Sequence, residues 1–144
     1  MKIKYLSLMI LGFGLMGCGE KSEPDLLVVC GGVISDEHIN FDFKNNLVTE
    51  RIFYKPFYLE AVRATGNLEP SKTREFPIEE STNSFIEYGA GSDTSLKVSM
   101  IFDRASMTKK TETAYYNFDG SLREPIGDLP NPMYVTQNCT KPKV

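Results

Sequence analysis

Four residues near position 40 form the densest set of side chains that could bind a metal ion or move a proton. Asp36, Glu37, His38 and Asp42 offer carboxylate oxygens and one imidazole. Because alternate side chains of a strand point to the same face, a strand here would place Asp36, His38 and Asp42 together. A charged face exposed to solvent predicts the same residue types. We favour the solvated face, and we assign no metal ligand and no cofactor.

The remaining titratable residues show no recognisable catalytic arrangement. His38 is the only histidine, and a general base of this kind needs a nucleophile within hydrogen-bonding reach. No Gly-x-Ser-x-Gly sequence presents a serine on a strand-to-helix turn. Adjacent acids such as Glu79 and Glu80 are typical of a solvated surface. The sequence therefore predicts no catalytic residue, and we expect a protein that is not an enzyme.

The first eighteen residues have the three-part layout of a secretory signal. Two lysines give a positive start, residues 6–16 form an apolar run, and the small residue Gly17 precedes Cys18. The run is shorter than the roughly 20 apolar residues that a helix needs to cross a bilayer. The tetrapeptide Leu-Met-Gly-Cys that ends at Cys18 resembles the lipobox of bacterial lipoproteins. The resemblance implies that the precursor is acylated on Cys18 and cut just before it; cleavage at an ordinary secretory site is the alternative.

The lipoprotein resemblance also implies a location and a division of the chain. Residues 1–17 would be the signal peptide, residues 18–25 a lipidated tether, and residues 26–144 a β domain. Two or more acyl chains anchor a protein stably. Gly19, rather than an aspartate, follows the cysteine, which points to the outer membrane in the sorting rule of similar lipoproteins. We expect a lipid-anchored protein of the bacterial envelope that faces the periplasm.

The mature chain is small and modestly acidic. Removing residues 1–17 leaves 127 of the 144 residues, enough for one domain with its own core and too few for two. It also removes two lysines and no acid, which leaves 14 Lys and Arg against 19 Asp and Glu, a net charge of −5. A phosphate-binding surface needs clustered basic residues, and we interpret the only local cluster, Lys109-Lys110, as part of the solvated surface. We therefore expect no nucleic acid partner.

Assigning Cys18 to the lipid leaves Cys30 and Cys139 as a pair. Exported proteins meet oxidising conditions in which disulfides persist, whereas metal binding by two cysteines requires further ligands at suitable spacing. His38 is eight positions from Cys30 and belongs to no such pattern. We predict a disulfide that joins the first strand to the last.

Apolar and polar residues alternate through much of residues 26–144, which is the pattern of half-buried strands. The clearest case is 95–103, where Leu96, Val98, Met100 and Phe102 share one face. The other predicted strands lie at 26–34, 39–43, 47–54, 84–88, 111–118 and 133–139. We predict a strand rather than a short helix at 57–64 from its aromatic and β-branched residues, and we interpret the proline-containing stretches 68–82 and 121–132 as long loops. Seven or eight strands with short turns predict a single all-β domain, an antiparallel barrel or sandwich.

These features favour a non-enzymatic envelope lipoprotein that acts as a binding or interaction module for a protein or a cell-wall ligand. The layout is similar to that of the membrane-bound inhibitors of C-type lysozyme, which combine a lipobox, a small antiparallel barrel and a disulfide between an early and a late strand. The chain lacks the Ser-Gly-x-x-Tyr loop of that family, so the resemblance assigns no inhibitory residue. A small envelope hydrolase or a structural subunit of an envelope assembly would also have a lipid anchor and a single β domain, and the oligomeric state is left open.

Overall fold

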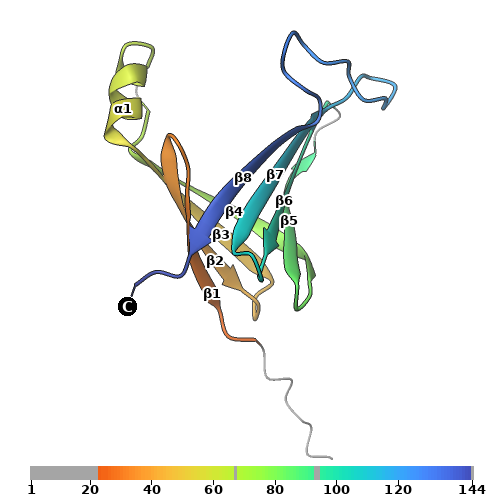
Figure 1. Ribbon diagram of the computed structural model, residues 1–144. Coiled ribbons are helices and arrows are strands. Elements are labelled where there is room, and N and C mark those ends of the chain that lie inside the picture. The colour runs from red at the N-terminus through yellow and green to blue at the C-terminus, as the bar shows by residue number, and fades with distance from the viewer. Residues whose placement is uncertain (1–22, 67, 93–94, 144) are drawn as a thin grey trace, which may run out of the picture.

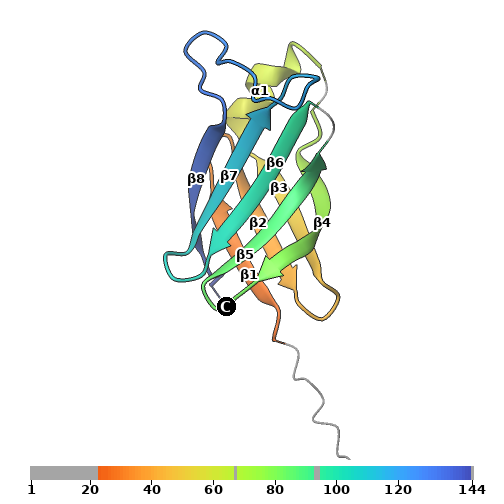
Figure 2. The same ribbon diagram turned by 90° about the vertical axis from the view of Figure 1, so that its right-hand side faces the viewer.

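The computed structural model describes residues 23–66, 68–92 and 95–143, and Cys18 lies outside them. The elements within these ranges are β1 (Leu26–Gly31), β2 (Ser35–Asp42), β3 (Leu47–Tyr54), α1 (Pro56–Arg63), β4 (Ser71–Ser81), β5 (Phe85–Ser92), β6 (Leu96–Asp103), β7 (Thr108–Tyr115) and β8 (Met133–Thr140). Each strand pairs antiparallel with the next, and β8 returns to β1, which closes a barrel in sequence order (Figures 1 and 2). The predicted all-β fold is confirmed, and the barrel is the architecture it takes.

The two ends of the barrel differ. The end at which β1 begins and β8 finishes carries the short turns 43–46, 82–84 and 104–107, and we call it the closed end. The opposite end carries α1 and the long segment 116–132, and we call it the open end (Figure 1). Because the chain enters the barrel at the closed end, the open end points away from the side on which Glu23 and Leu26 lie.

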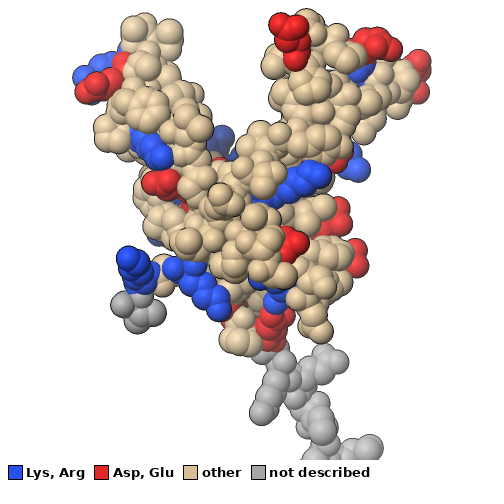
Figure 3. Space-filling view, in the orientation of Figure 1, with Lys and Arg blue, Asp and Glu red and all other residues tan. Residues whose placement is uncertain are grey.

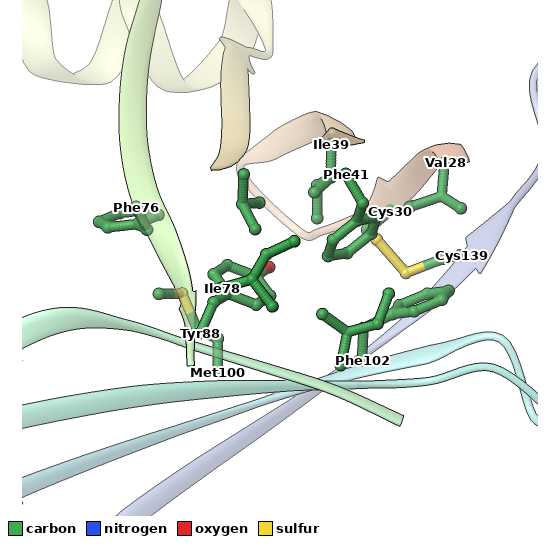
Figure 4. Close-up of a cluster of buried hydrophobic side chains, with 12 residues drawn as sticks. Val28, Cys30, Ile39, Phe41, Phe76, Ile78, Tyr88, Met100, Phe102 and Cys139 are labelled. Atoms are coloured by element: carbon green, nitrogen blue, oxygen red, sulfur yellow. A yellow bond between two sulfur atoms is a disulfide. The ribbon is translucent and has the colours of Figure 1, made fainter. Parts of the chain in front are cut away.

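The strands form because their side chains alternate between the inside and the outside of the barrel. In β6, Met100 and Phe102 are buried, whereas Ile101 between them is 38% exposed. Large side chains fill the barrel toward the closed end, where the Phe41 ring centroid lies 5.2 Å from that of Phe102 and 5.7 Å from that of Tyr88 (Figure 4). Full burial of such a side chain contributes about 1.5–3 kcal/mol, so this cluster is a main source of the stability of the barrel.

Toward the open end, the barrel separates into two sheets. β1 pairs with β8 only at Val29–Thr140 and Cys30–Cys139, and β4 pairs with β5 only within Ile78–Ser81. Beyond these pairs the strands on either side diverge, which gives the molecule its V shape (Figures 1 and 3). The predicted cysteine pair forms a disulfide with an S–S distance of 2.01 Å. It joins the two sheets close to the point at which they begin to separate.

Residues 57–64 belong largely to a helix, so the prediction of a strand there was wrong. α1 begins at Pro56, whose fixed φ suits the first position of a helix and whose missing N–H would have no helical partner there. The backbone N–H groups of Tyr58 and Leu59 donate to the Lys55 carbonyl at 3.0 and 3.2 Å. Across the described ranges, no helix combines the length and the apolar character needed to cross a membrane.

Residues 68–82, predicted as a loop, contain the eleven-residue strand β4, so this prediction was also wrong. The prolines and polar side chains of this stretch were the reason for predicting a loop. Residues 71–77 pair with β3 on one side only, and an edge of this kind tolerates Pro77 because its missing N–H breaks no second ladder. The other stretch, 121–132, forms isolated bridges only, in keeping with its prediction as a loop.

Candidate functional site

A hollow of about 580 Å³ lies between the two diverging sheets and opens to solvent (Figure 3). The β1–β2 turn and β2 wall it on one side, β6, β7 and β8 wall it on the other, and Arg74 of β4 reaches into it. Apolar side chains such as Val98, Met100 and Val135 share its walls with the polar Thr111 and Gln137. Small-molecule sites have volumes of about 300–1,000 Å³ and mostly apolar walls with a few polar groups. The hollow has both properties.

Four charged residues and a tyrosine form a hydrogen-bonded cluster at the floor of this hollow. Glu50 of β3 accepts three bonds, from the Tyr88 hydroxyl at 2.7 Å, from Lys109 Nζ at 2.7 Å and from Arg74 Nη2 at 2.6 Å. Lys109 Nζ also donates to Glu37 at 2.5 Å. The side chains of Glu50 and Lys109 are 0% and 1% exposed. We call these five residues the floor cluster; its two acids and two bases compensate one another, as buried charges require.

The period of the strands places the floor cluster inside the barrel. Glu50 lies between the buried Val48 and Ile52 at even spacing, so all three point inward. Arg74 lies directly opposite Glu50 on β4 and therefore shares its face. Lys109 of β7 lies directly opposite the buried Phe102 of β6, so its side chain also points inward. The charged groups meet because each occupies an inward position of a different strand.

The surroundings of the floor cluster determine which of its groups are ionised. Burial by itself would raise the pKa of Glu50, but the charge of Lys109, the hydrogen bonds from Lys109 and Tyr88 and the charge of Arg74 outweigh it and lower the pKa below its usual value. Burial and then the negative charge of Glu50 raise the pKa of Tyr88 well above its usual value. At neutral pH, Glu50 is therefore an anion that accepts bonds on both oxygens, and Tyr88 is a neutral donor.

Lys55 holds the first rim of the hollow, which is formed by the β1–β2 turn. Its Nζ donates to the Gly32 carbonyl at 2.6 Å, and its backbone N–H donates to the Ile34 carbonyl at 2.9 Å. A side chain at Gly32 would bring its Cβ to 2.8 Å from the Ser35 carbonyl oxygen and 3.2 Å from Gln137 Nε2. This rim therefore requires glycine, because any Cβ would push the turn away from β8.

Asn131 holds the second rim, formed by the segment 116–132. Its Oδ1 accepts from the backbone N–H of Tyr115 at 2.9 Å, and its Nδ2 donates to the carbonyls of Tyr115 and Arg123 at 2.8 and 2.6 Å. A single amide side chain thus joins the C-terminal end of the segment to its middle and to the last residue of β7. The same segment leaves Phe118, Ile126 and Leu129 largely exposed, so the open end presents apolar groups to solvent.

The four residues considered as metal ligands are divided between the two faces of β2. Asp36, His38 and Asp42 share the outer face, as the spacing predicted, whereas Glu37 points inward to the floor cluster. At one end of the strand, Asp36 Oδ1 lies 3.8 Å from Lys55 Nζ. At the other end, Asp42 Oδ1 accepts a hydrogen bond from the backbone N–H of Asn45 in the following turn. Within the described part of the chain, no three His, Cys, Asp or Glu side chains are grouped so that they could hold a metal ion.

The floor cluster was not predicted from the sequence. Lys109 was assigned to the solvated surface, which was wrong, because Lys109 is buried between Glu37 and Glu50. A signal was present at Glu50, the one charged residue at an inward position among the alternating apolar residues of 47–54. No comparable signal marks Arg74, which lies in a stretch that was not predicted as a strand.

A scan against protein-family models and searches among curated proteins and solved structures find no match to this chain. The proposed function is therefore based on the geometry of the hollow and of the floor cluster.

Proposed function

We propose that this chain is a lipid-anchored, non-enzymatic protein of the bacterial envelope that binds a ligand in the hollow of its barrel. The observation that carries the proposal is an open hollow of about 580 Å³ whose floor is a buried cluster of charges. A buried ion pair is often no more stabilising than apolar residues of the same volume. The floor cluster is thus poorly explained by stability alone, whereas polar groups at the base of an apolar site orient a ligand.

The direction of the chain supports this proposal. If Cys18 carries the lipid, the seven residues 19–25 reach at most about 25 Å when fully extended, which would keep the domain close to its membrane. β1 begins at the closed end, and the hollow lies toward the open end. An anchor at Cys18 in the outer membrane would therefore leave the hollow facing away from the bilayer, accessible to periplasmic ligands.

Binding, rather than catalysis, fits the chemistry of the floor cluster. Glu50 already accepts three hydrogen bonds, so it has little capacity left to take a proton from a substrate. The raised pKa of Tyr88 keeps its hydroxyl protonated at neutral pH, and a protonated phenol is a poor nucleophile. These groups hold one another in place and are suited to presenting a fixed polar surface.

Two matched variants test whether the hollow is the ligand site. Val98→Trp places a large side chain in the hollow, and Ile101→Trp places the same side chain on the outer face of the same strand. We expect native mass spectrometry of protein isolated from its own envelope to find a small molecule on the wild type and on Ile101→Trp, and none on Val98→Trp. Equal retention by the two variants, or an unliganded wild type, would contradict the proposal.

A second candidate function is inhibition of a C-type lysozyme. It is favoured by the eight-stranded antiparallel barrel and by the disulfide between β1 and β8, which match the layout of the membrane-bound inhibitors. A lysozyme assay with the mature chain at micromolar concentration tests this candidate directly. Inhibition that Val98→Trp leaves unchanged would support it, and absence of inhibition would remove it.

A further inference from the structure

We propose that the hollow binds a small amphipathic anion, with a carboxylate, sulfonate or phosphate group on the Arg74 guanidinium and an apolar body along Val98, Met100 and Val135. This inference rests on the proposed function, since it assumes that the hollow is a ligand site. It adds the chemical class of the ligand and the residue that recognises its charge.

Arg74 has hydrogen-bonding capacity that the protein does not use. A guanidinium carries five N–H donors, and in the structure only Nη2 donates to a described side chain, that of Glu50. Nε is buried without a partner. The side chain is 34% exposed, which leaves Nη1 as the nitrogen that can face the hollow. Nη1 carries two N–H groups on a cation, and such donors form strong, charge-assisted hydrogen bonds with carboxylate and phosphate groups.

Arg74 is also the most accessible charge of the floor cluster. The side chains of Lys109 and Glu50 are 1% and 0% exposed, and that of Glu37 is 12% exposed and bonded to Lys109. The cluster is neutral as a whole, but the charge that a ligand would meet first is the positive charge of Arg74. Because Glu50 already accepts three bonds, it holds the guanidinium in place and leaves the outer nitrogen free to bind an acceptor.

The walls above Arg74 fit an apolar body. Val98 and Met100 come from β6 and Val135 from β8, and all three line the hollow. Thr111, between them on β7, adds a hydroxyl that could accept or donate one hydrogen bond. A site with one charged group at its base and apolar walls discriminates in favour of molecules that are charged at one end only.

A pair of fluorescent probes measures how much the negative charge of a ligand contributes to binding. Anilinonaphthalene sulfonate and phenylnaphthylamine share their aromatic rings and differ by the sulfonate. With the mature chain, residues 18–144 carrying Cys18→Ser, we expect the sulfonate probe to bind about tenfold more tightly or better, the range of one charge-assisted hydrogen bond. Arg74→Met should remove this preference. Arg51→Met, the same change on the exposed outer face of β3, should keep it.

A second variant covers the case in which Arg74→Met does not fold. Arg74→Lys keeps the charge beside Glu50 but loses the outer nitrogen Nη1, so we expect a preference for the sulfonate that is reduced and still present. Decanoate and naphthyl phosphate then serve as competitors. Decanoate represents ligands with an acyl chain and a carboxylate, and naphthyl phosphate represents ligands with an aromatic ring and a phosphate. Displacement of the probe by either one supports the inference, and displacement by neither overturns it.

The outcomes separate this inference from the proposed function. If both probes bind equally and Val98→Trp abolishes both, the hollow is a ligand site but the anionic class is wrong. If Val98→Trp leaves both probes bound, or neither probe binds the wild type, the inference is overturned. Native mass spectrometry of the protein from its own envelope then tests the proposed function independently, because it detects a bound ligand of any chemical class.

Discussion

Glu50 is the residue on which the floor cluster depends. It accepts bonds from Tyr88, Lys109 and Arg74 and is itself fully buried. Removing one partner of a buried charged set leaves the others uncompensated, which costs far more than the intact set contributes. The two basic residues of the cluster therefore need the Glu50 carboxylate if the hollow is to keep a charged floor.

The variant Glu50→Gln tests this dependence. It keeps the size of the side chain and removes the negative charge beside Lys109 and Arg74, so we expect the free energy of unfolding to fall by about 3–5 kcal/mol at pH 7. Glu75→Gln, on the exposed face of β4, is the matched control, with an expected change within about 0.5 kcal/mol. Urea denaturation measures both; equal effects of the two variants would show that Lys109 and Arg74 do not depend on the Glu50 carboxylate.

The lowered pKa of Glu50 predicts a pH dependence with a definite sign. Because its folded pKa lies below the ordinary value of 4.5, ionised Glu50 stabilises the fold above that pH, and its contribution is lost as the pH falls through the folded pKa. The stability difference between the wild type and Glu50→Gln should be largest at neutral pH and shrink below about pH 4.5. A difference that stays constant as the pH is lowered would show that its origin is not the charge.

Single residues also show how far the sequence alone could lead. The cysteine pair was predictable, because Cys30 and Cys139 remain once Cys18 is assigned to lipid. Lys109 was not, because its burial depends on Glu37 and Glu50, which lie 72 and 59 positions away in the sequence. A charged residue becomes a core residue only when the fold supplies its partner, and the partner cannot be identified from local sequence.

At the scale of elements, the alternation of apolar and polar residues predicted a strand correctly where that strand pairs with a neighbouring strand on both sides. β3 spans Leu47–Tyr54 as predicted, and β6 shows the predicted inward face. β4 and α1 were predicted wrongly, each for its own reason. Residues 71–77 pair with one strand only, so their composition resembles a loop. In α1, Pro56 outweighs the β-propensity of the residues that follow it.

The disulfide is the element-scale connection between the two sheets. It links β1 to β8 across a sequence separation of 109 residues, at one of the two residue pairs that join these strands. In the chain-entropy view, a loop of this length contributes up to about 4–5 kcal/mol. We expect Cys30→Ala/Cys139→Ala to lower the free energy of unfolding by an amount approaching this figure in urea denaturation. Reducing the wild type should reproduce the shift, and an unchanged unfolding midpoint in both experiments would contradict it.

At the scale of the whole molecule, the barrel is asymmetric from end to end. The closed end holds the start of β1 and the aromatic cluster around Phe41, and the open end holds α1, the segment 116–132 and the hollow. This asymmetry relates the proposed anchor to the proposed site, because attachment through Cys18 would turn the hollow away from the bilayer. The sequence predicted an antiparallel barrel or sandwich, of which the structure shows the barrel, but the hollow results from the short pairing of β1 with β8 and of β4 with β5.

The proposed anchor has its own test. We expect the intact mass of the protein from its native envelope to match a chain that begins at Cys18 and carries acyl groups. Cys18→Ser should leave the membrane fraction or remain as an uncut precursor. A mature protein that retains Met1, or an unmodified Cys18, would contradict the lipoprotein proposal while leaving the barrel and its hollow unaffected.

The central claim is that the hollow between the two sheets is a ligand site, and methyl NMR of the mature chain tests it most directly. Adding the small-molecule extract of the envelope should shift the methyl resonances of Val98, Met100 and Val135, which line the hollow. The methyl resonances of Ile101, on the outer face of β6, should stay in place. Shifts confined to the outer face, or no shift at saturating extract, would contradict the claim.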